Sequence, residues 1–351
     1  MAQVPTDSLF SMSRIGLRSA LAIGVAVTMA SALIAPIAQA APTLAQIQAQ
    51  VRQLEEDATA AAEGAQAAKV QLATLTKTLS GLKQEAAAQG ATVDALKKSL
   101  GTIAIEQYKA GGLSQGLELL FSANPELYLS SAGSLESITR AKSSQLRKFE
   151  AAEQRLNATK LTVDDKLALV QAAQKRFAQK SAQAKSKLAA AEKILSKLKK
   201  EDRARLAALK AAEEDADQAS SKAYASSAGA ISGRAGIAIK YALKQIGDRY
   251  VFGAAGMITW DCSGLTMRAY QAAGVSLPHS SRAQSSYGRS VSFKSAKPGD
   301  LFFYGQPISH VGIYLGGGKM VHAPRSGSRV KVVSNAATAL GSKRLVAIRR
   351  F

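Results

Sequence analysis

The sequence holds one cysteine, Cys262, in 351 residues, and only three histidines. A single cysteine excludes an intramolecular disulfide, so the folded chain must be stable through packing alone. One thiol and three histidines also make a poor set of zinc ligands, and we expect neither a metal nor a cofactor. A lone thiol is either a small buried hydrophobe or a working nucleophile, and its surroundings must decide between the two.

Proline and aromatic residues are scarce between Thr43 and about Lys222, where Pro125 is the one proline. This stretch is rich in Ala, Lys, Gln, Glu and Leu, whereas glycines, aromatics and β-branched residues dominate from about Gly236 onward. The small residues of 223–236 predict a flexible linker between two parts.

The N-terminus has the features of an export signal. Arg14 and Arg18 precede an apolar run over 20–34 without a charge, and Ala-Gln-Ala at 38–40 provides a small-x-small cleavage site. We therefore predict a signal peptide at 1–40, with an uncleaved membrane anchor as the alternative. The run is short for a span of about 20 residues. The mature protein is expected to be secreted, extracellular or associated with a bacterial cell wall.

The first part of the mature chain carries a regular heptad of apolar residues, in steps that alternate between three and four. This spacing is typical of a coiled-coil seam. A helix over 43–108 would extend roughly 95–100 Å at about 1.5 Å per residue. Only Gln89 interrupts the series, whose members are Leu44, Ile47, Val51, Leu54, Ala58, Ala61, Ala65, Ala68, Leu72, Leu75, Leu79, Leu82, Ala86, Val93, Leu96, Leu100 and Ile103.

A second helical stretch, at about 134–219, has a looser apolar stripe. Two long helices joined by a short segment most economically form an antiparallel hairpin, which we assign to 41–222; a homodimeric coil is the alternative. The connecting tip, at about 109–133, is the most apolar part of this region. It is expected to pack back on the hairpin or to dock another protein.

Acidic residues are scarce in the C-terminal part. Residues 236–351 hold 16 Lys and Arg residues against three acids, a net charge of +13. Such a field attracts polyanions. Outside a cell these are anionic wall polymers and membrane lipids, and a merely solubilising surface is the alternative. No nucleic-acid recognition motif accompanies the charge, so we expect no nucleic-acid partner.

Cys262 lies at the predicted start of a helix. The pattern becomes helical from Asp261 to Tyr270, and Asp261 is a natural N-cap residue. Cys262 then falls in the first turn, where unpaired backbone N–H groups and the positive helix end favour the thiolate.

Two histidines follow in strand-like runs, His310 at the start of one and His322 in the next. A thiolate nucleophile needs a histidine to take its proton and a third group to orient that histidine. Both residue numbers are even, so a regular two-residue turn would place these side chains on opposite faces, and sharing a face requires a bulge or an odd loop. Strands are expected at 301–304, 310–315, 319–323, 330–333 and 345–348.

Several motifs, in order, resemble those of the NlpC-type cell-wall cysteine peptidases, which are papain-like endopeptidases of peptidoglycan stem peptides. The match covers roughly 237–351. We expect an α+β papain-like catalytic domain there, with the cysteine on a helix N-terminus packed on an antiparallel sheet, preceded by a long all-α coiled-coil hairpin. The motifs are Asp261-Cys262-Ser263-Gly264, Pro298-Gly299-Asp300-Leu301, His310-Val311-Gly312-Ile313-Tyr314-Leu315-Gly316 and His322-Ala323-Pro324.

The resemblance implies a role for each matching residue. Cys262 would be the nucleophile, His310 the general base and His322 the group that orients His310. Tyr250, which matches the family's tyrosine before the cysteine, is implied to contact the substrate or the oxyanion. Asp261 and Ser263, which flank the nucleophile, are assigned to the same substrate and oxyanion set.

The chain also departs from the family's pattern. Arg249 stands where the family usually has proline, Ala254-Ala255 where a second glycine is common, and His279 where arginine usually follows Leu-Pro. None of these positions belongs to the triad, so the departures bear on substrate fit. We expect His279, in a loop after Pro278, to lie at the surface.

The resemblance implies a secreted peptidoglycan hydrolase that cleaves between D-glutamate and the diamino acid of the stem peptide, in cell separation or wall remodelling. The coil resembles helical hairpins of secreted septal wall hydrolases, which implies regulation by a division-associated membrane complex. One alternative is a coiled-coil activator or scaffold with a vestigial catalytic domain. Another is an acyltransferase that uses the same thioester chemistry. The hairpin is predicted to fold back and occlude the active site, or else to act only as a tether.

Overall fold

The computed structural model describes residues 42–109, 125–229, 231–341 and 343–351. The signal peptide predicted at 1–40 lies outside the described residues, as does the 110–124 portion of the predicted apolar tip. No helix within the described ranges is both long enough and apolar enough to cross a membrane.

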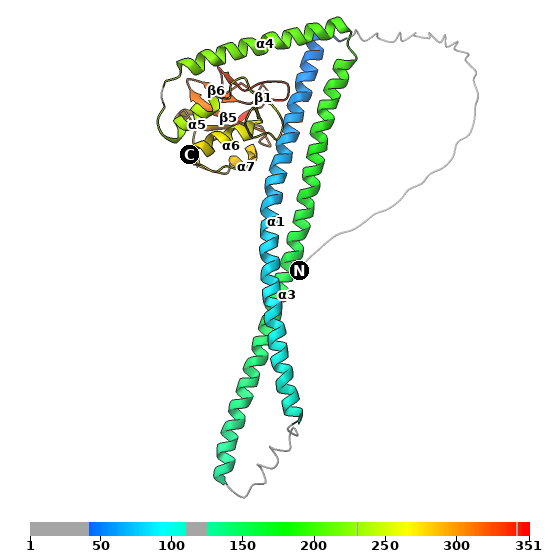
Figure 1. The fold of residues 1–351 in the computed structure, drawn as a ribbon, viewed down its shortest axis with the longest axis vertical. Helices are drawn as coiled ribbons and strands as arrows, with labels where there is room; N and C mark the ends of the chain where they lie inside the picture. Colours follow the sequence, from blue (N-terminus) through cyan, green and yellow to red (C-terminus); the bar gives the residue numbers. More distant parts are fainter. Residues whose placement is uncertain (1–41, 110–124, 230, 342) are drawn as a thin grey trace, which may run out of the picture. The chain divides into compact units, whose positions relative to one another are not determined.

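Two long helices, α1 (Leu44–Lys109) and α3 (Pro125–Ser196), lie side by side and antiparallel (Figure 1). The direction follows from contacts at both ends: Lys187 Nζ donates to Asp57 Oδ2 at 3.0 Å, and Lys142 Nζ donates to Gln107 Oε1 at 3.1 Å. Toward residues 110–124 the two helices cross and then separate. The intramolecular hairpin therefore agrees with the apolar seam read from the sequence.

The second helix is shorter than predicted, because the chain turns after Ser196 and a separate helix, α4 (Lys200–Ser227), follows. At this elbow Leu198 and Leu206 pack against Ile47 near the start of α1. The predicted single helix over 134–219 is thus wrong. No glycine or proline in the sequence signals the end of the helix at this point. The burial of Leu198 and Leu206 against Ile47 favours the turn over a continuous helix.

The predicted flexible linker at 223–236 is also wrong for most of its length. Helix α4 continues to Ser227, and α5 (Gly233–Leu243) begins after five intervening residues. Tyr224 holds the end of α4 in place: it packs against the core of the C-terminal domain, and Lys319 Nζ lies 5.8 Å from the centroid of its ring. Small residues permit a linker, but they are equally compatible with a helix when one side chain is anchored.

The C-terminal domain is built on one antiparallel sheet with the strand order β3-β8-β4-β5-β6-β7. A short parallel pair, β1 (Arg249–Tyr250) and β2 (Thr259–Trp260), lies outside this sheet. All five strands predicted from the sequence are present, and β3 is added to them. The strands are β3 (Arg289–Ser290), β4 (Leu301–Tyr304), β5 (His310–Gly316), β6 (Lys319–His322), β7 (Lys331–Val333) and β8 (Leu345–Arg350).

The sheet is buried on both faces. Leu301 and Phe303 of β4 join one hydrophobic cluster, together with residues of α5 and α6 (Cys262–Ala272), while Phe302 and Tyr304 join a second. This alternation is the two-residue period of a strand. The fully buried members of both clusters lie between Ala238 and Ile348, so residues 233–351 contain the core on which the sheet is built. Short α7 (Ser281–Gln284) and the 3-10 turn η1 (Phe293–Ser295) complete the domain.

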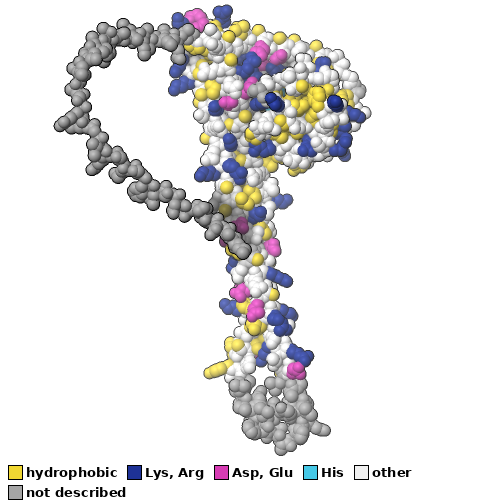
Figure 2. Space-filling model, turned by 180° about the vertical axis from the view of Figure 1, so that it is seen from behind, with side chains coloured by type: hydrophobic (Ala, Val, Ile, Leu, Met, Phe, Trp, Pro, Cys, Tyr) yellow, Lys and Arg dark blue, Asp and Glu magenta, His cyan; other side chains and the backbone are white. Residues whose placement is uncertain are grey.

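Positive side chains are spread over this domain. Figure 2 shows Lys and Arg side chains distributed across one of its faces, with few acidic side chains among them. The view agrees with the excess of basic residues in the C-terminal sequence.

Candidate active site

Cys262 is the first residue of α6 and is completely buried. Asp261 caps this helix: its side chain accepts hydrogen bonds from the backbone N–H of Gly264 at 2.6 Å and of Gly253 at 2.9 Å. The N-cap predicted from the sequence is therefore confirmed. The thiol lies at a helix N-terminus, where backbone N–H groups point toward a developing negative charge.

The two histidines predicted to act with Cys262 lie on neighbouring strands β5 and β6. The pairing partners include Ile313 with Val321, and the register then shifts between Tyr314 and Gly316. This bulge brings His310 and His322 to the same face of the sheet, because the shift by one residue reverses the orientation that a regular two-residue turn would impose. The predicted irregular hairpin is confirmed.

His310 and His322 contact each other directly. His310 Nε2 lies 2.9 Å from His322 Nδ1, and the two rings meet edge to face at 83°. Within the described residues, His310 Nδ1 is buried without a hydrogen-bond partner. The arrangement fits a His310 tautomer that donates from Nε2 to His322 and keeps the Nδ1 lone pair free to accept a proton.

The remaining predicted site residues surround the thiol. Helix α6 packs on β5, and the backbone of Val311, next to His310, lies close enough to Cys262 to lower the pKa of the thiol against the stronger effects that raise it. Tyr250 is buried, and burial together with the charges of Cys262 and Asp261 raises its pKa well above the ordinary value. Ser263, which follows Cys262 in α6, is buried. The structure thus brings Cys262, Tyr250, Asp261 and Ser263 to one place.

An acidic residue from the hairpin occupies this site. Glu63 of α1 is 2 % exposed, and its Oε1 lies 3.2 Å from Cys262 Sγ. Ser263 Oγ donates to the same oxygen at 2.7 Å. Oε2 accepts hydrogen bonds from Ser281 N at 2.9 Å and from Ser281 Oγ at 2.7 Å. The side chain of Glu63 therefore covers the thiol of Cys262, and its carboxylate is held by Ser263 and Ser281 beside that thiol.

This occupied site is electrostatically unfavourable for a thiolate–imidazolium pair. Burial, followed by the charges of Glu63 and Asp261, raises the pKa of Cys262 well above its usual value. Burial, with a smaller contribution from His322, holds the pKa of His310 well below the usual value for histidine. Both shifts favour the neutral thiol and the neutral imidazole over the ion pair in this conformation.

The segment of α1 around Glu63 is closely packed on two sides. Ala58, Ala61 and Ala65 belong to the predicted seam with α3, while Thr59 and Gln66 are also buried although they lie off that seam. Phe252 of the C-terminal domain packs against Ala61 and Ala62, beside Ala184 of α3. Small side chains let the domain approach the backbone of α1 closely enough for Glu63 to reach Cys262.

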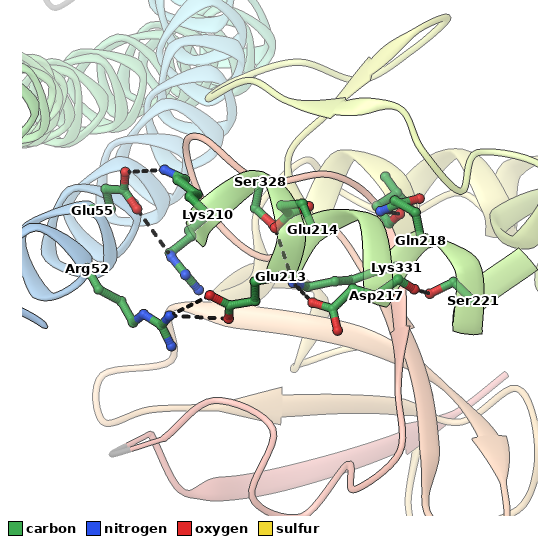
Figure 3. A network of polar contacts seen from close by, with 12 residues as sticks. Arg52, Glu55, Lys210, Glu213, Glu214, Asp217, Gln218, Ser221, Ser328 and Lys331 are labelled. Carbon is green, nitrogen blue, oxygen red and sulfur yellow. Dashed lines mark hydrogen bonds and ion pairs between the residues drawn. The ribbon is translucent and has the colours of Figure 1, made fainter. Parts of the chain in front are cut away.

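Helix α4 runs along strand β7, at the edge of the sheet (Figure 3). Lys331 Nζ lies 3.3 Å from Glu214 Oε1 and 2.5 Å from Asp217 Oδ2. Ser221 Oγ accepts a hydrogen bond from Val332 N at 2.9 Å. Helix α4 therefore covers backbone groups that an edge strand would otherwise leave unpaired.

A second set of ion pairs joins α1, α4 and the C-terminal domain. Glu55 of α1 contacts Lys210 of α4 at 2.9 Å (Figure 3). It also contacts Arg325 of the domain, at 3.4 Å. Arg52 of α1 also pairs with Glu213 of α4, at 2.9 Å. Acidic residues of the helices thus hold the basic domain against the hairpin.

His279 does not lie free at the surface, as the sequence analysis expected. Its side chain is 20 % exposed, and Nε2 lies 2.9 and 2.8 Å from the two carboxylate oxygens of Asp261. The buried charge of Asp261 draws the imidazole inward. This pairing was missed because the two residues are 18 positions apart and separated by a helix and a loop.

No group of three or more His, Cys, Asp or Glu side chains is placed to hold a metal ion within the residues that the structure describes. Glu63 was also missed by the sequence analysis, since it lies 199 residues before Cys262 and off the heptad seam. One signal was present: Thr59, Glu63 and Gln66 are polar residues at helical spacing in a segment of otherwise small side chains.

Comparisons with known proteins agree with this geometry. Residues 247–350 match the model of the NlpC/P60 family. A probable endopeptidase of Mycobacterium tuberculosis is 44 % identical over 95 residues, which is 27 % of this chain and 25 % of that protein. The probable endopeptidase p60 of Listeria monocytogenes is 47 % identical over 91 residues, 25 % of this chain and 19 % of that protein. The chain thus spans a quarter or less of the length of these relatives.

Solved structures also match part of the chain. The NlpC/p60 domain of the peptidoglycan hydrolase SagA is 36 % identical, with a TM-score of 0.29; the match covers 32 % of this chain and 97 % of that one. The P60 domain of an antigen from M. avium subspecies paratuberculosis is 29 % identical, with a TM-score of 0.30, covering 33 % and 93 %. Over residues 247–350, the chain therefore carries an NlpC/P60 domain.

Proposed function

We propose that the mature protein is a secreted peptidoglycan hydrolase that cleaves stem-peptide amide bonds by a Cys-His-His mechanism. One observation carries the proposal: the lone thiol lies at the start of α6, which packs on β5, while His310 at the start of β5 is hydrogen-bonded to His322. The names of the matched endopeptidases and of SagA support the same reaction class.

In the proposed reaction, His310 Nδ1 takes the proton of Cys262, and the thiolate attacks the amide carbonyl. Backbone N–H groups at the start of α6 stabilise the oxyanion. The imidazolium then donates its proton to the leaving amine, and water hydrolyses the thioester to release the acid and the free thiol. His322 keeps Nε2 of His310 hydrogen-bonded throughout, which holds the ring in the orientation that the transfer requires.

We propose that the bond cleaved joins D-glutamate to the diamino acid. The carboxylate of Glu63 is held by Ser263 Oγ and by Ser281 N and Oγ, directly beside the nucleophile. A γ-linked D-glutamyl residue carries a free α-carboxylate near the scissile amide, and the same donors would hold it. In this account Glu63 occupies the position of the substrate carboxylate.

We further propose that the hairpin inhibits the enzyme until it is displaced. Glu63 covers Cys262, and ion pairs at Lys331 and Glu55 fix α4 and α1 to the domain. Uncontrolled hydrolysis of the wall would lyse the cell, so a closed resting state is useful. A division-associated membrane complex that binds the distal part of the hairpin would open it, and the enzyme would then act in cell separation. The positive domain would add affinity for anionic wall polymers.

Product analysis tests this function. Purified peptidoglycan is digested with residues 233–351 and with the same domain carrying Cys262→Ala, and the fragments are identified by mass spectrometry. Free D-glutamyl carboxyl ends and free diamino acid amines, formed only by the intact thiol, are the expected products. Fragments joined through a new amide would indicate an acyltransferase instead. The absence of any thiol-dependent product would indicate a scaffold with a vestigial domain.

A further inference from the structure

The pair formed by His279 and Asp261 has no place in the mechanism above. His279 precedes α7, two residues before the serine that holds Glu63, and its ring contacts both oxygens of a carboxylate that is 1 % exposed. Asp261 is in turn the N-cap of the helix that begins with Cys262. One side chain thus joins the loop before α7 to the residue adjacent to the nucleophile.

We propose that His279, as an imidazolium, is a positioning residue for hydrolysis: it orients the cap of the Cys262 helix and balances the charge of Asp261 when the thiol ionises. The inference rests on the proposed function. It extends that function by making the activity depend on the protonation of a residue outside the triad.

The need for a cation follows from the charges next to the thiol. Asp261 is a buried carboxylate adjacent in sequence to Cys262, and its charge is one of the causes that raise the pKa of the thiol. Among the described residues, His279 is the ion-pair partner of Asp261. Without that cation, a thiolate would form beside an unbalanced buried charge, which is costly in a medium of low dielectric constant.

The surroundings of His279 favour its charged form near neutral pH. Burial by itself would lower the pKa of His279, but the hydrogen bond to Asp261 and the charges of Asp261 and Glu63 raise it above the ordinary value, against an opposing contribution from Lys69. The ring is partly exposed, so it can exchange a proton with solvent. Arginine, which the family carries at this position, would hold a permanent charge, whereas histidine makes the charge titratable.

The first test is a titration of the intact mature chain. Since the chain has three histidines and two are fully buried neighbours, ring ¹⁵N shifts assign His279 without ambiguity. We expect it to titrate above its ordinary value, and Asp261→Asn to remove this elevation. Titration of His279 at or below the ordinary value in the unmodified chain would overturn the proposal.

The second test measures the thiol directly, and does not require hydrolysis to occur. The alkylation rate of Cys262, the chain's only thiol, is followed in residues 233–351 from about pH 5 to about pH 9, across the range in which histidine changes charge. His279→Gln keeps a hydrogen-bond donor but no charge. It should lower the rate below neutrality by about tenfold, the effect of one unit in the pKa of the thiol. His279→Arg should restore the rate.

The pH profiles of kcat/KM separate positioning from a merely structural role. The unmodified domain should lose activity as the pH rises through the value at which His279 titrates, because the cation is then lost. His279→Arg should lack this loss and retain activity to higher pH. The proposal would be overturned if His279→Gln and His279→Arg lost equal activity while the pH profile of kcat/KM stayed unchanged. It would also be overturned if neither variant changed kcat/KM. Thermal unfolding of each variant verifies that the domain is folded. If the alkylation rates of Cys262 are as expected but the domain hydrolyses no substrate, the proposed function is refuted while the role of His279 stands.

Discussion

Glu63→Ala should open the active site of the chain that contains both the hairpin and the C-terminal domain, residues 41–351. The side chain accepts three short hydrogen bonds, from Ser263 Oγ at 2.7 Å, Ser281 Oγ at 2.7 Å and Ser281 N at 2.9 Å. At about 1 kcal/mol net for each, their loss weakens closure by about 3 kcal/mol, or about 150-fold in the ratio of closed to open protein. The variant should also remove a negative charge that raises the pKa of Cys262.

The assay uses the single thiol of the chain. Alkylation of Cys262 by a small reagent reports access to the nucleophile, and turnover of a soluble stem peptide reports activity, with no contribution from wall binding. Glu106→Ala provides a matched control, because Glu106 is an exposed acid on the same helix. Both rates should rise in Glu63→Ala and stay unchanged in the control. Identical rates in Glu63→Ala and the unmodified protein would refute the reasoning that Glu63 closes the site.

Three further outcomes are expected. Cys262→Ala should abolish hydrolysis while the unfolding temperature changes little, because a sulfur at a helix start contributes modestly to packing; residual lysis would place the nucleophile elsewhere. Lys331→Ala should raise the turnover of the mature protein about fivefold, for a loss of about 1 kcal/mol at the contact with α4, whereas exposed Lys222→Ala should not. Burial, followed by the charge of Asp261, raises the pKa of Glu63 in the closed state. Closure is therefore favoured below the ordinary pKa of a glutamate and weakens as the pH rises through the raised value. The amide of Glu63→Gln resembles the protonated carboxyl group. In this variant, the alkylation rate of Cys262 should no longer show the pH dependence that Glu63 gives to the unmodified chain.

Local patterns were sufficient to predict the elements that carry the catalytic groups. The heptad from Leu44 to Ile103 predicted α1, and Asp261 marked the start of α6 because an aspartate N-cap satisfies backbone donors within its own turn. The even spacing of His310 and His322 predicted a bulge, since side-chain orientation alternates along a strand. Each of these inferences depends on neighbours within a few residues or within one hairpin.

The contacts that close the site could not be predicted in this way. Glu63 and Cys262 meet only because the domain docks on α1, and nothing in the sequence near either residue specifies that docking. The elbow after Ser196 similarly depends on burial of Leu198 and Leu206 against Ile47, far away in the chain. His279 was expected at the surface because a loop position after proline is usually exposed, and the buried charge that attracts it lies in another element.

The central claim, that the hairpin closes a competent thiol peptidase, is tested most directly by comparing two proteins on one substrate. Turnover of the same soluble stem peptide is measured with residues 41–351 and with residues 233–351, both verified as folded. The structure predicts that the isolated domain is the faster enzyme and that its Cys262 is alkylated readily, because Glu63 is absent. Equal turnover by the two proteins would contradict the account and leave the hairpin as a tether.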